Sequence, residues 1–275
     1  SQHQLFQKYD SFEEEDYREL SNYCDEVGID FLSTPFDLDS VDFLDKLMPF
    51  YKISSSDITN TPLLKRVASK NKVVVLSTGA SKIDEIKYAI EILNKFGAES
   101  VCLLHCILNY PTRYTDSNLN MIEDQIAHFP NNLIGYSDHT LPDDKMLTLT
   151  SAFMKGAVIL EKHFTHNKKL PGNDHYHAMN KEDLKIFNDN IRFLEKIGGS
   201  LKKYPIESEK IARRNARRSI VLTRDLKKGH VLINSDLIAK RPGTGISPTF
   251  WDEIIGKTLN KDLKSDHILS LNELN

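Results

Sequence analysis

Residues 72–79 read Lys-Val-Val-Val-Leu-Ser-Thr-Gly, and this stretch decides the fold class. Its β-branched, apolar centre predicts a strand that is buried on both faces, and Gly79 ends that strand. A capping-box pair, Ser81 and Asp84, follows at once. Apolar residues then recur at helical spacing, at positions 83, 86, 90 and 93. A buried strand followed directly by an amphipathic helix is the repeating unit of parallel α/β folds.

The same unit recurs from residue 11 to about residue 199. Ser11 and Glu14 predict the start of a first helix, which Gly28 ends, and Thr61-Pro62 predicts a cap followed by a first-turn proline. Each predicted strand ends in polar residues. The six strands are Ile29–Phe36, Tyr51–Ser55, Lys72–Thr78, Ser100–Cys106, Leu133–His139 and Ala157–Phe164.

Six such units fit either an open doubly wound sheet or a (β/α)8 barrel. Two observations favour the barrel. No strand–turn–helix junction carries G-x-G-x-x-G or a P-loop, and polar residues stand at the C-terminal ends of all six strands, where barrel enzymes assemble their sites. Because a barrel has eight strands, we expect either that two strands precede residue 1 or that the sheet is open.

The composition of the chain changes after residue 199. Residues 200–218 are polar and charged and are interpreted as a linker. The arginines at 213, 214, 217 and 218 favour a solvated face over a nucleic-acid site. Residues 219–275 hold short apolar segments between turns, which is typical of a small module that packs against another surface. The predicted organisation is a domain over 1–199, a linker over 200–218 and a second domain over 219–275.

Composition excludes several classes of protein. The 275 residues include 36 Lys plus Arg and 39 Asp plus Glu, a net charge of −3, and 40% are hydrophobic, as in ordinary globular proteins. A pI near 6.4 gives no electrostatic basis for binding nucleic acid. No apolar run approaches the roughly 18 residues of a membrane span, and Ser1–Gln4 carries no signal peptide. Cys24, Cys102 and Cys106 are an odd number and have no metal-type spacing beyond a lone C-x-x-x-C, so we expect a reduced, cytoplasmic protein.

Two histidines, His139 and His163, stand at the ends of neighbouring predicted strands. Two imidazoles in that position can hold a divalent cation and leave open positions for substrate or water. The alternative is a pair of hydrogen-bonded structural histidines, and the residues alone leave both open. Strand alternation puts Glu161 on the same face as His163. His105 and His128 lack such a partner and are expected to be structural.

Lys52 begins the segment K-I-S-S-S-D, and hydroxyls recur at the strand ends. The lysine suits a Schiff base, a phosphate contact or a surface charge. Hydroxyls and a lysine at one rim suit an anionic, phosphate-bearing ligand, although each hydroxyl singly is also a common helix cap. The hydroxyl residues are Thr34, Ser55, Ser77, Thr78 and Ser137. In the longest loop, P-G-N-D at 171–174 either places an acceptor over the rim or forms an exposed turn.

The ordered motifs of the chain resemble those of the sialic acid synthase family. They are F-L-S-T-P-F, Y-K-I-S-S-S-D, V-L-S-T-G, L-L-H-C…Y-P-T, G-Y-S-D-H-T, L-E-K-H-F-T and P-G-N-D. Members of that family condense phosphoenolpyruvate with an N-acetylated mannose-type sugar to give a nine-carbon 2-keto acid. The C-terminal R-R-S-I, D-L-K-K-G and K-R-P-G-T-G-I resemble the family's antifreeze-like (SAF) module, a small β-clip-like fold. The resemblance implies a TIM barrel whose first two strands are not in this chain.

The resemblance also implies roles for individual residues. His139 and His163 would bind Mn²⁺ or Mg²⁺, Tyr110 and Asp174 would contact the sugar, and Asp57 would lie beside the reacting carbons. Lys52 would count, with Asp57, among the catalytic residues. The residues implied to hold phosphoenolpyruvate are Thr34, Lys52, Ser55, Ser77 and Ser137.

Two further implications concern the assembly and the differences from the family. Arg241 would reach from the SAF module over the barrel of a partner subunit in a domain-swapped homodimer. The family's first two strands carry an acid and a second phosphate-binding lysine, which we expect to lie before residue 1. Many relatives also have a polar residue where this chain has Leu108.

Two other functions stay open from the residues. A class I aldolase on the same barrel would form a Schiff base on a lysine, and it predicts borohydride trapping with pyruvate. A sugar- or phosphosugar-binding protein without catalysis predicts binding of the ligand without turnover.

Overall fold

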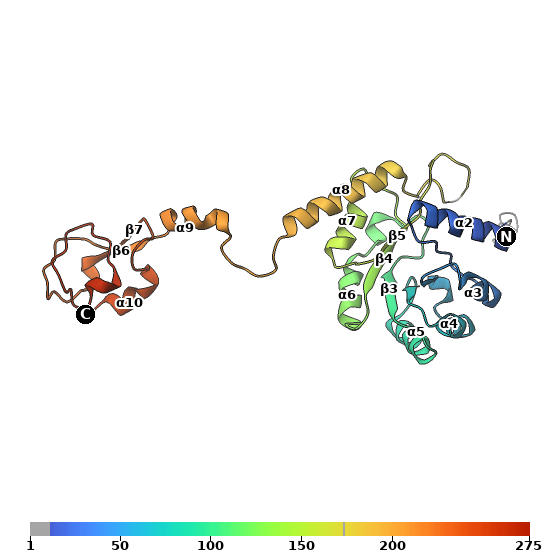
Figure 1. The fold of residues 1–275 in the computed structure, drawn as a ribbon, viewed down its shortest axis with the longest axis horizontal. Coiled ribbons are helices and arrows are strands. Elements are labelled where there is room, and N and C mark those ends of the chain that lie inside the picture. Colours follow the sequence, from blue (N-terminus) through green and yellow to red (C-terminus); the bar gives the residue numbers. More distant parts are fainter. Residues whose placement is uncertain (1–11, 173) are drawn as a thin grey trace. The chain divides into compact units, whose positions relative to one another are not determined.

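The computed structural model describes residues 12–172 and 174–275. The chain divides between residues 198 and 199 into two compact units, which Figure 1 shows in one ribbon. Each unit is described by itself below. Within the described residues, no helix has both the length and the apolar character needed to cross a membrane.

A five-stranded parallel sheet forms the centre of the first unit, in the order β1-β2-β3-β4-β5. The strands are β1 (Tyr51–Ile53), β2 (Val74–Ser77), β3 (Val101–His105), β4 (Ile134–Asp138) and β5 (Leu160–Lys162). All five lie inside predicted strands. Their order follows the sequence without a reversal, which is the order of a barrel and not of a doubly wound sheet. The predicted parallel α/β class is confirmed.

The sheet is strongly curved. In a flat sheet, strands about 4.8 Å apart would leave β1 and β5, at opposite edges, about 19 Å from each other. Yet Nζ of Lys52 on β1 lies 3.4 Å from Oε2 of Glu161 on β5. Side chains from the two edges therefore meet on the concave face, and the five strands form a half-barrel.

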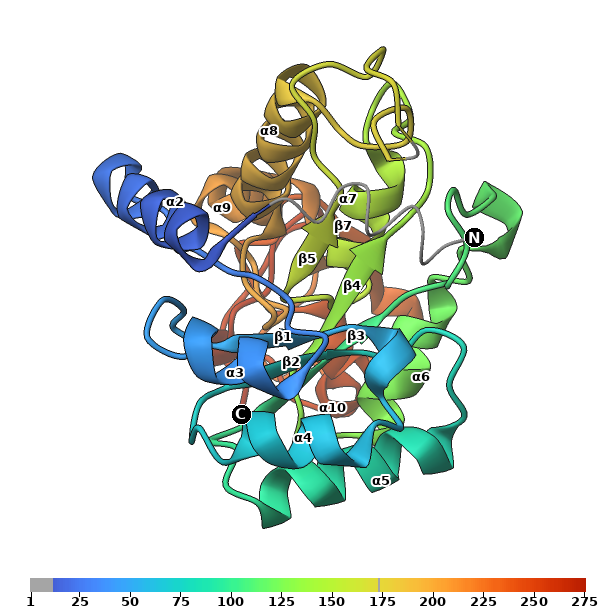
Figure 2. The same cartoon turned by 90° about the vertical axis from the view of Figure 1, so that its right-hand side faces the viewer.

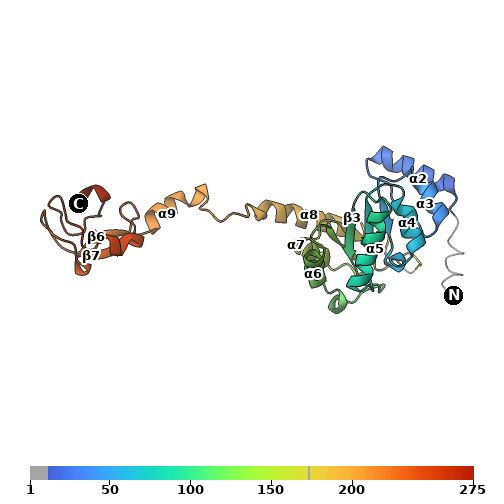
Figure 3. The same ribbon diagram turned by 90° about the horizontal axis from the view of Figure 1, so that it is seen from below.

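Helices cover the outside of this half-barrel. They are α2 (Glu14–Val27), α3 (Leu38–Leu44), α4 (Thr61–Ala68), α5 (Ile83–Lys95), α6 (Asn120–His128), α7 (Leu147–Met154) and α8 (Lys181–Gly198). Short 3₁₀ turns, η1 (Ser55–Asp57) and η2 (Tyr114–Asp116), follow β1 and β3. Figure 2 shows α3, α4 and α5 outside strands β1 to β3, and Figure 3 shows these helices in succession. Their buried apolar residues pack with those of the strands into one core.

The predicted strand Ile29–Phe36 is wrong. The segment belongs to no strand, and β1 is an edge of the sheet in the described residues. The backbone N–H of Ile29 donates to Cys24 O, and that of Ser33 contacts the sulfur of Met48. The side chains of Ile29 and Phe36 are 62% and 64% exposed. Alternating apolar residues favour a half-buried extended backbone, but a strand also needs a paired neighbour, which this segment lacks.

Two helix starts differ by one residue from the prediction. Asn60 caps α4, since its Oδ1 accepts from Leu63 N, so the cap lies one residue earlier than expected. In α5 the carboxylate of Glu85 accepts from Lys82 N, one residue later than expected. Side-chain oxygens of several neighbouring residues can cap the same turn. The sequence therefore predicts the presence of a helix more reliably than its first residue. The predicted cap Ser11 lies outside the described residues, and helix α2 is instead capped by Glu13, paired with Asp16, two residues later than expected.

The second unit has its own apolar core, in which Ile220, Leu232, Leu259 and Leu269 are almost fully buried. Its elements are η3 (Glu207–Glu209), α9 (Lys210–Ala216), β6 (Ser219–Leu222), η4 (Asn234–Asp236), β7 (Leu237–Lys240), η5 (Pro248–Phe250), α10 (Trp251–Ile254) and η6 (Leu271–Glu273). Strands β6 and β7 are antiparallel. Helix α9 lies in the segment interpreted as a linker, and it is held to this unit by Gly243 N, which donates to Arg214 O.

Candidate functional site

Polar side chains gather at the C-terminal ends of the strands, on the concave face. Glu161 on β5 is the centre of one group: its Oε1 accepts from Ser137 Oγ on β4 at 2.6 Å, and its Oε2 lies 3.4 Å from Lys52 Nζ on β1. The lysine side chain is only 13% exposed. The structure thus brings together two residues implied for an anionic ligand and adds a carboxylate between them.

Ser77, at the end of β2, is 3% exposed, and its hydroxyl has no hydrogen-bond partner among the described residues. A buried hydroxyl left in this state costs about 1–3 kcal/mol unless a ligand or water completes it. Close by, Ser55 Oγ and Cys106 Sγ pack under Gly79, where an added Cβ would lie 2.8 Å from the sulfur. Burial raises the pKa of the Cys106 thiol, which therefore stays neutral.

His139 follows β4, and its imidazole is oriented by the backbone. Its Nδ1 lies 2.8 Å from the Ile107 carbonyl, which can only accept, so Nδ1 carries the proton and Nε2 keeps its lone pair. The ring centroids of His139 and His163 are 5.5 Å apart. Burial lowers the pKa of both imidazoles. The neutral form that binds cations is therefore favoured.

A second cluster surrounds His163, which follows β5. Asp174 Oδ2 lies 3.8 Å from His163 Nδ1, and Asp174 Oδ1 lies 3.9 Å from His177 Nε2. One ligand atom from each of these three residues lies within 4.8 Å of the others, the one such group found in the described residues. Two imidazoles and a carboxylate form a common donor set for divalent transition metals. The residues present therefore fit a divalent cation; His139 stands beside this group rather than in it.

Tyr110 lies against the histidines. Its ring centroid is 4.2 Å from that of His139 and 5.7 Å from that of His163. Thr112 N donates to His139 O at 2.8 Å, which holds the loop after β3 to the end of β4. Burial raises the pKa of Tyr110 to about 12, so its hydroxyl stays protonated at neutral pH. An aromatic face and a neutral hydroxyl beside two imidazoles suit a polar organic ligand such as a sugar.

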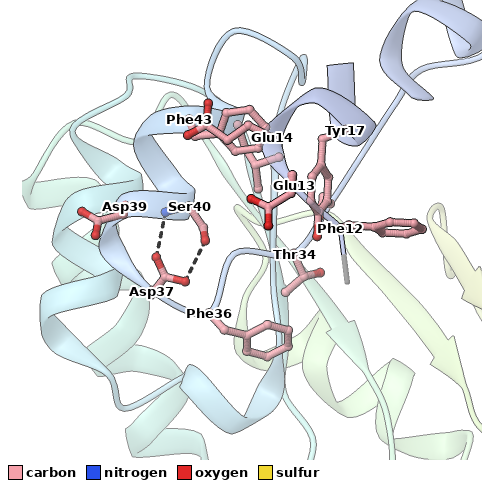
Figure 4. Close-up of a pocket in the computed structure, with 12 residues that line it drawn as sticks. Phe12, Glu13, Glu14, Tyr17, Thr34, Phe36, Asp37, Asp39, Ser40 and Phe43 are labelled. Carbon is pink, nitrogen blue, oxygen red and sulfur yellow. Dashed lines mark hydrogen bonds between the residues drawn. The ribbon is translucent and has the colours of Figure 1, made fainter. Parts of the chain in front are cut away.

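Thr34 belongs to the segment between α2 and α3 in the first unit. It lines a cavity of about 800 Å³ between the start of α2 and the segment that leads into α3 (Figure 4). The cavity walls carry the carboxylates of Glu13, Glu14, Asp37 and Asp39 and include none of the histidines. An acidic lining repels anions, so this cavity does not suit a phosphate-bearing ligand.

Two other expected residues make local contacts. The Asp57 carboxylate accepts from Asn60 Nδ2 at 2.9 Å and from the Ser56 hydroxyl at 3.1 Å. Arg241 belongs to the second unit, where its Nε donates to Ala216 O at 3.0 Å. The roles expected for both residues stay predictions.

Sequence reasoning missed two features of this site. It put Glu161 on the correct face but did not foresee its contacts with Ser137 and Lys52, which depend on the curvature of the sheet. It also passed over His177. The available signal was the spacing of Asp174 and His177, three residues apart in the loop already singled out for P-G-N-D.

Comparisons with known proteins agree with this architecture. Residues 1–203 match the NeuB family, and residues 217–275 match the SAF domain. The chain belongs to the NeuB family. The expected sialic-acid-synthase resemblance and the expected SAF module are both confirmed.

Two relatives of this NeuB-family chain have named activities. It is 41% identical to the N,N'-diacetyllegionaminic acid synthase of Legionella pneumophila, over 92% of this chain and 71% of that protein. It is 37% identical to the synthase of the same name from Campylobacter jejuni, over 98% of this chain and 80% of that protein. The chain is therefore a homologue of sugar-acid synthases and spans most, but not all, of their length.

The fold of this NeuB-family chain also matches a solved structure. The putative spore coat polysaccharide biosynthesis protein E of Chromobacterium violaceum superimposes with a TM-score of 0.84. The match covers 96% of this chain and 79% of that one at 24% identity, a similarity that speaks to the fold alone.

Proposed function

We propose that this protein condenses phosphoenolpyruvate with an N-acetylated mannose-type sugar and water, giving a nine-carbon 2-keto sugar acid and phosphate. The observation that carries the proposal is the buried, unpartnered hydroxyl of Ser77 on the same rim as an imidazole–carboxylate cluster. One rim thus offers donors for an anion and ligands for a cation. The named activities of the two relatives support the same reaction class.

The anionic half of the site would hold phosphoenolpyruvate. Lys52 supplies a positive charge, and Ser55, Ser77 and Ser137 supply hydroxyls. The family resemblance also implies Thr34, but the acidic cavity that it lines does not favour a phosphate, so the proposal rests on the other four residues. Without ligand, the Glu161 carboxylate engages both Lys52 and Ser137. A phosphate or carboxylate of the substrate would compete with that carboxylate for the same donors.

The cationic half would hold Mn²⁺ or Mg²⁺ on His139 and His163. A cation bound there supplies Lewis-acid polarisation of the sugar's aldehyde oxygen. Tyr110, packed against His139, would place the sugar over the rim, and Asp174 would accept from a sugar hydroxyl. The backbone carbonyl of Ile107 fixes the tautomer of His139 before any ligand binds.

The reaction follows from the two halves. C3 of phosphoenolpyruvate attacks the aldehyde carbon of the open-chain sugar, forming the C–C bond, and water adds to the electron-poor C2. The tetrahedral intermediate then breaks its C–O bond and releases phosphate. Lys52 and the serine hydroxyls hold the phosphate and carboxylate in line for attack, where orientation lowers the barrier by several kcal/mol. Asp57 would move a proton beside the reacting carbons.

The assembly is part of the proposal. Among the described residues β1 is an edge of the sheet, so a closed eight-stranded barrel would need further strands beside it. Arg241 would act on the sugar in the barrel of a partner subunit, in a domain-swapped homodimer. Since phosphoenolpyruvate is a phosphorylated metabolite, the proposed reaction belongs in the cytoplasm.

The test is a sugar panel with the full-length protein, phosphoenolpyruvate and Mn²⁺, following phosphate release. Because the two relatives are named N,N'-diacetyllegionaminic acid synthases, a diacetamido-trideoxy sugar comes first in the panel, and N-acetylmannosamine comes next. We expect phosphate release that needs both substrates, and ¹⁸O from the bridging position of phosphoenolpyruvate in the released phosphate. Borohydride trapping of pyruvate on a lysine would instead establish the aldolase, and ligand binding without turnover would establish the binding protein.

A further inference from the structure

The loop between β5 and α8 returns to the end of β5 and is fixed there by backbone hydrogen bonds. Met179 N donates to His163 O, and Thr165 N donates to Met179 O, each at 2.8 Å. Residues 164 and 179 form a parallel bridge. His177 lies two residues before this bridge and is 1% exposed. Its ring centroid is 5.0 Å from that of His163.

The same loop holds Asp174 at a fixed distance from His177. Ala178 N donates to the Asp174 carbonyl at 3.1 Å, closing one turn of backbone. The ring of His175, between them, is turned away to Thr165, whose hydroxyl lies 2.8 Å from His175 Nδ1. The side chains of Asp174 and His177 therefore share one side of the turn, with Oδ1 and Nε2 3.9 Å apart.

These separations suit ligands of one ion. Donor atoms bound at about 2.1 Å lie about 3 Å apart when adjacent and about 4.2 Å apart when opposite. The distances from Asp174 to His163 and to His177 are 3.8 and 3.9 Å, and the whole group spans at most 4.8 Å. Because the donors would lie on one side of the ion, a bound cation would draw them together by about 1 Å or more, a shift to which rotation of the exposed Asp174 side chain can contribute. Two imidazoles and one carboxylate on one side of an ion leave its other positions open.

We propose that His177 is a protein ligand of the catalytic cation, together with His163 and Asp174. The inference rests on the proposed function and changes one part of it: Asp174 binds the cation rather than only the sugar. His139, whose ring centroid is 5.5 Å from that of His163, would complete the site from the end of β4.

The test measures Mn²⁺ binding to the full-length protein without substrates, by titration calorimetry and by electron paramagnetic resonance. We expect His177→Ala to weaken Mn²⁺ binding at least about tenfold. His166→Ala is the matched control, because His166 lies in the same loop but is exposed and outside the cluster. The control is expected to bind Mn²⁺ like the wild type. Unfolding in EDTA checks that both variants fold, and His177→Gln, closer in volume, replaces His177→Ala should that variant misfold.

A spectroscopic measurement identifies the ligand directly. Electron–nuclear double resonance of bound Mn²⁺ should show one imidazole nitrogen fewer in the His177 variant than in the wild type. Unchanged affinity with an unchanged nitrogen count overturns the role of His177 and leaves the proposed condensation standing. Condensation by the wild type that survives complete metal removal contradicts the cation half of the proposed function, whatever His177 binds.

Discussion

At the scale of single residues, substitution of Ser77 can distinguish a role in ligand binding from a role in stability. Its hydroxyl is buried and unpartnered, so the folded protein gains nothing from it without ligand. We therefore expect Ser77→Ala to leave the melting temperature unchanged or higher while raising KM for phosphoenolpyruvate about tenfold, the effect of one lost hydrogen bond to a charged group. Steady-state kinetics and thermal unfolding measure the two effects.

The control for this prediction is Thr140→Val. Thr140 also has a buried hydroxyl without a partner among the described residues, but no role at the rim is assigned to it. This change should be neutral for KM. If Ser77→Ala leaves KM unchanged as well, the Ser77 hydroxyl does not contact the substrate.

The residues of the rim differ in how far sequence could predict them. His139, His163 and Ser137 follow from one rule, because parallel strands bring their C-terminal ends to one edge and alternation sets the face. His177 does not follow from that rule. Its position depends on backbone hydrogen bonds between Met179 and the end of β5. A loop has no sequence periodicity from which such hydrogen bonds could be predicted.

At the scale of elements, a buried ion pair joins β4 to β5. Lys162 Nζ lies 2.6 Å from Asp138 Oδ2, and both side chains are 1% exposed. Thr140 N and the Tyr136 hydroxyl donate to the other carboxylate oxygen. Removing one partner leaves an uncompensated buried charge, so Asp138→Asn should cost about 3–5 kcal/mol of the free energy of unfolding. Urea denaturation followed by circular dichroism measures the loss.

The double variant Asp138→Asn, Lys162→Met tests the cause. Because it removes both charges, it should recover part of the lost stability. A double variant that is less stable than Asp138→Asn would mean that Lys162 is stabilised by groups other than Asp138.

The strands and helices differ in how well local sequence patterns predict them. Strands β2 and β3 lie in fully buried, mostly apolar runs, for which propensity and burial agree. Residues 29–36 also contain residues that favour strands, such as Ile29, Phe31 and Thr34, but a strand needs a second segment to pair with. A helix start depends on neighbouring residues and is therefore placed to within a few residues, whereas strand pairing depends on segments far away in the sequence.

In the second unit, a buried carboxylate predicts a pH dependence. Burial by itself would raise the pKa of Glu273, but Ser270 N, Lys261 and His267 outweigh burial and lower the pKa from 4.5 to about 2. An acid whose pKa is lower in the folded state stabilises it above the unfolded value. The contribution is thus complete above about pH 5 and is lost as the pH falls from 4.5 toward 2.

Trp251 offers the readout, because it is the single tryptophan of the chain and lies in helix α10. Its fluorescence during urea unfolding should report stability that declines through this pH range. Glu273→Gln should be less stable at pH 7 and show a smaller decline. An equally steep decline in the variant would assign the pH dependence to other carboxylates.

At the scale of the whole molecule, the proposal that Arg241 acts on the barrel of a partner subunit can be tested with mixed dimers. We expect Arg241→Ala in the full-length protein to weaken sugar use far more than phosphoenolpyruvate use, because a planar guanidinium suits sugar oxygens or a carboxylate. Mixing it with His139→Ala should restore some activity, since each mixed dimer pairs one intact barrel with an intact Arg241 from the other chain. Phosphate release from the mixture is the measurement. Verified subunit exchange without recovered activity would show that Arg241 does not act across the interface.

The contact between Lys52 and Glu161 has a consequence for how the family evolves. The two positions are 109 residues apart in sequence, on strands that never pair, yet their charged groups are 3.4 Å apart. A charge change at one position therefore alters the cost of a change at the other. In an alignment of diverse members, we therefore expect positions 52 and 161 to covary as strongly as residues that face each other on adjacent strands. Such covariation would indicate, from sequences alone, that the sheet curves into a barrel.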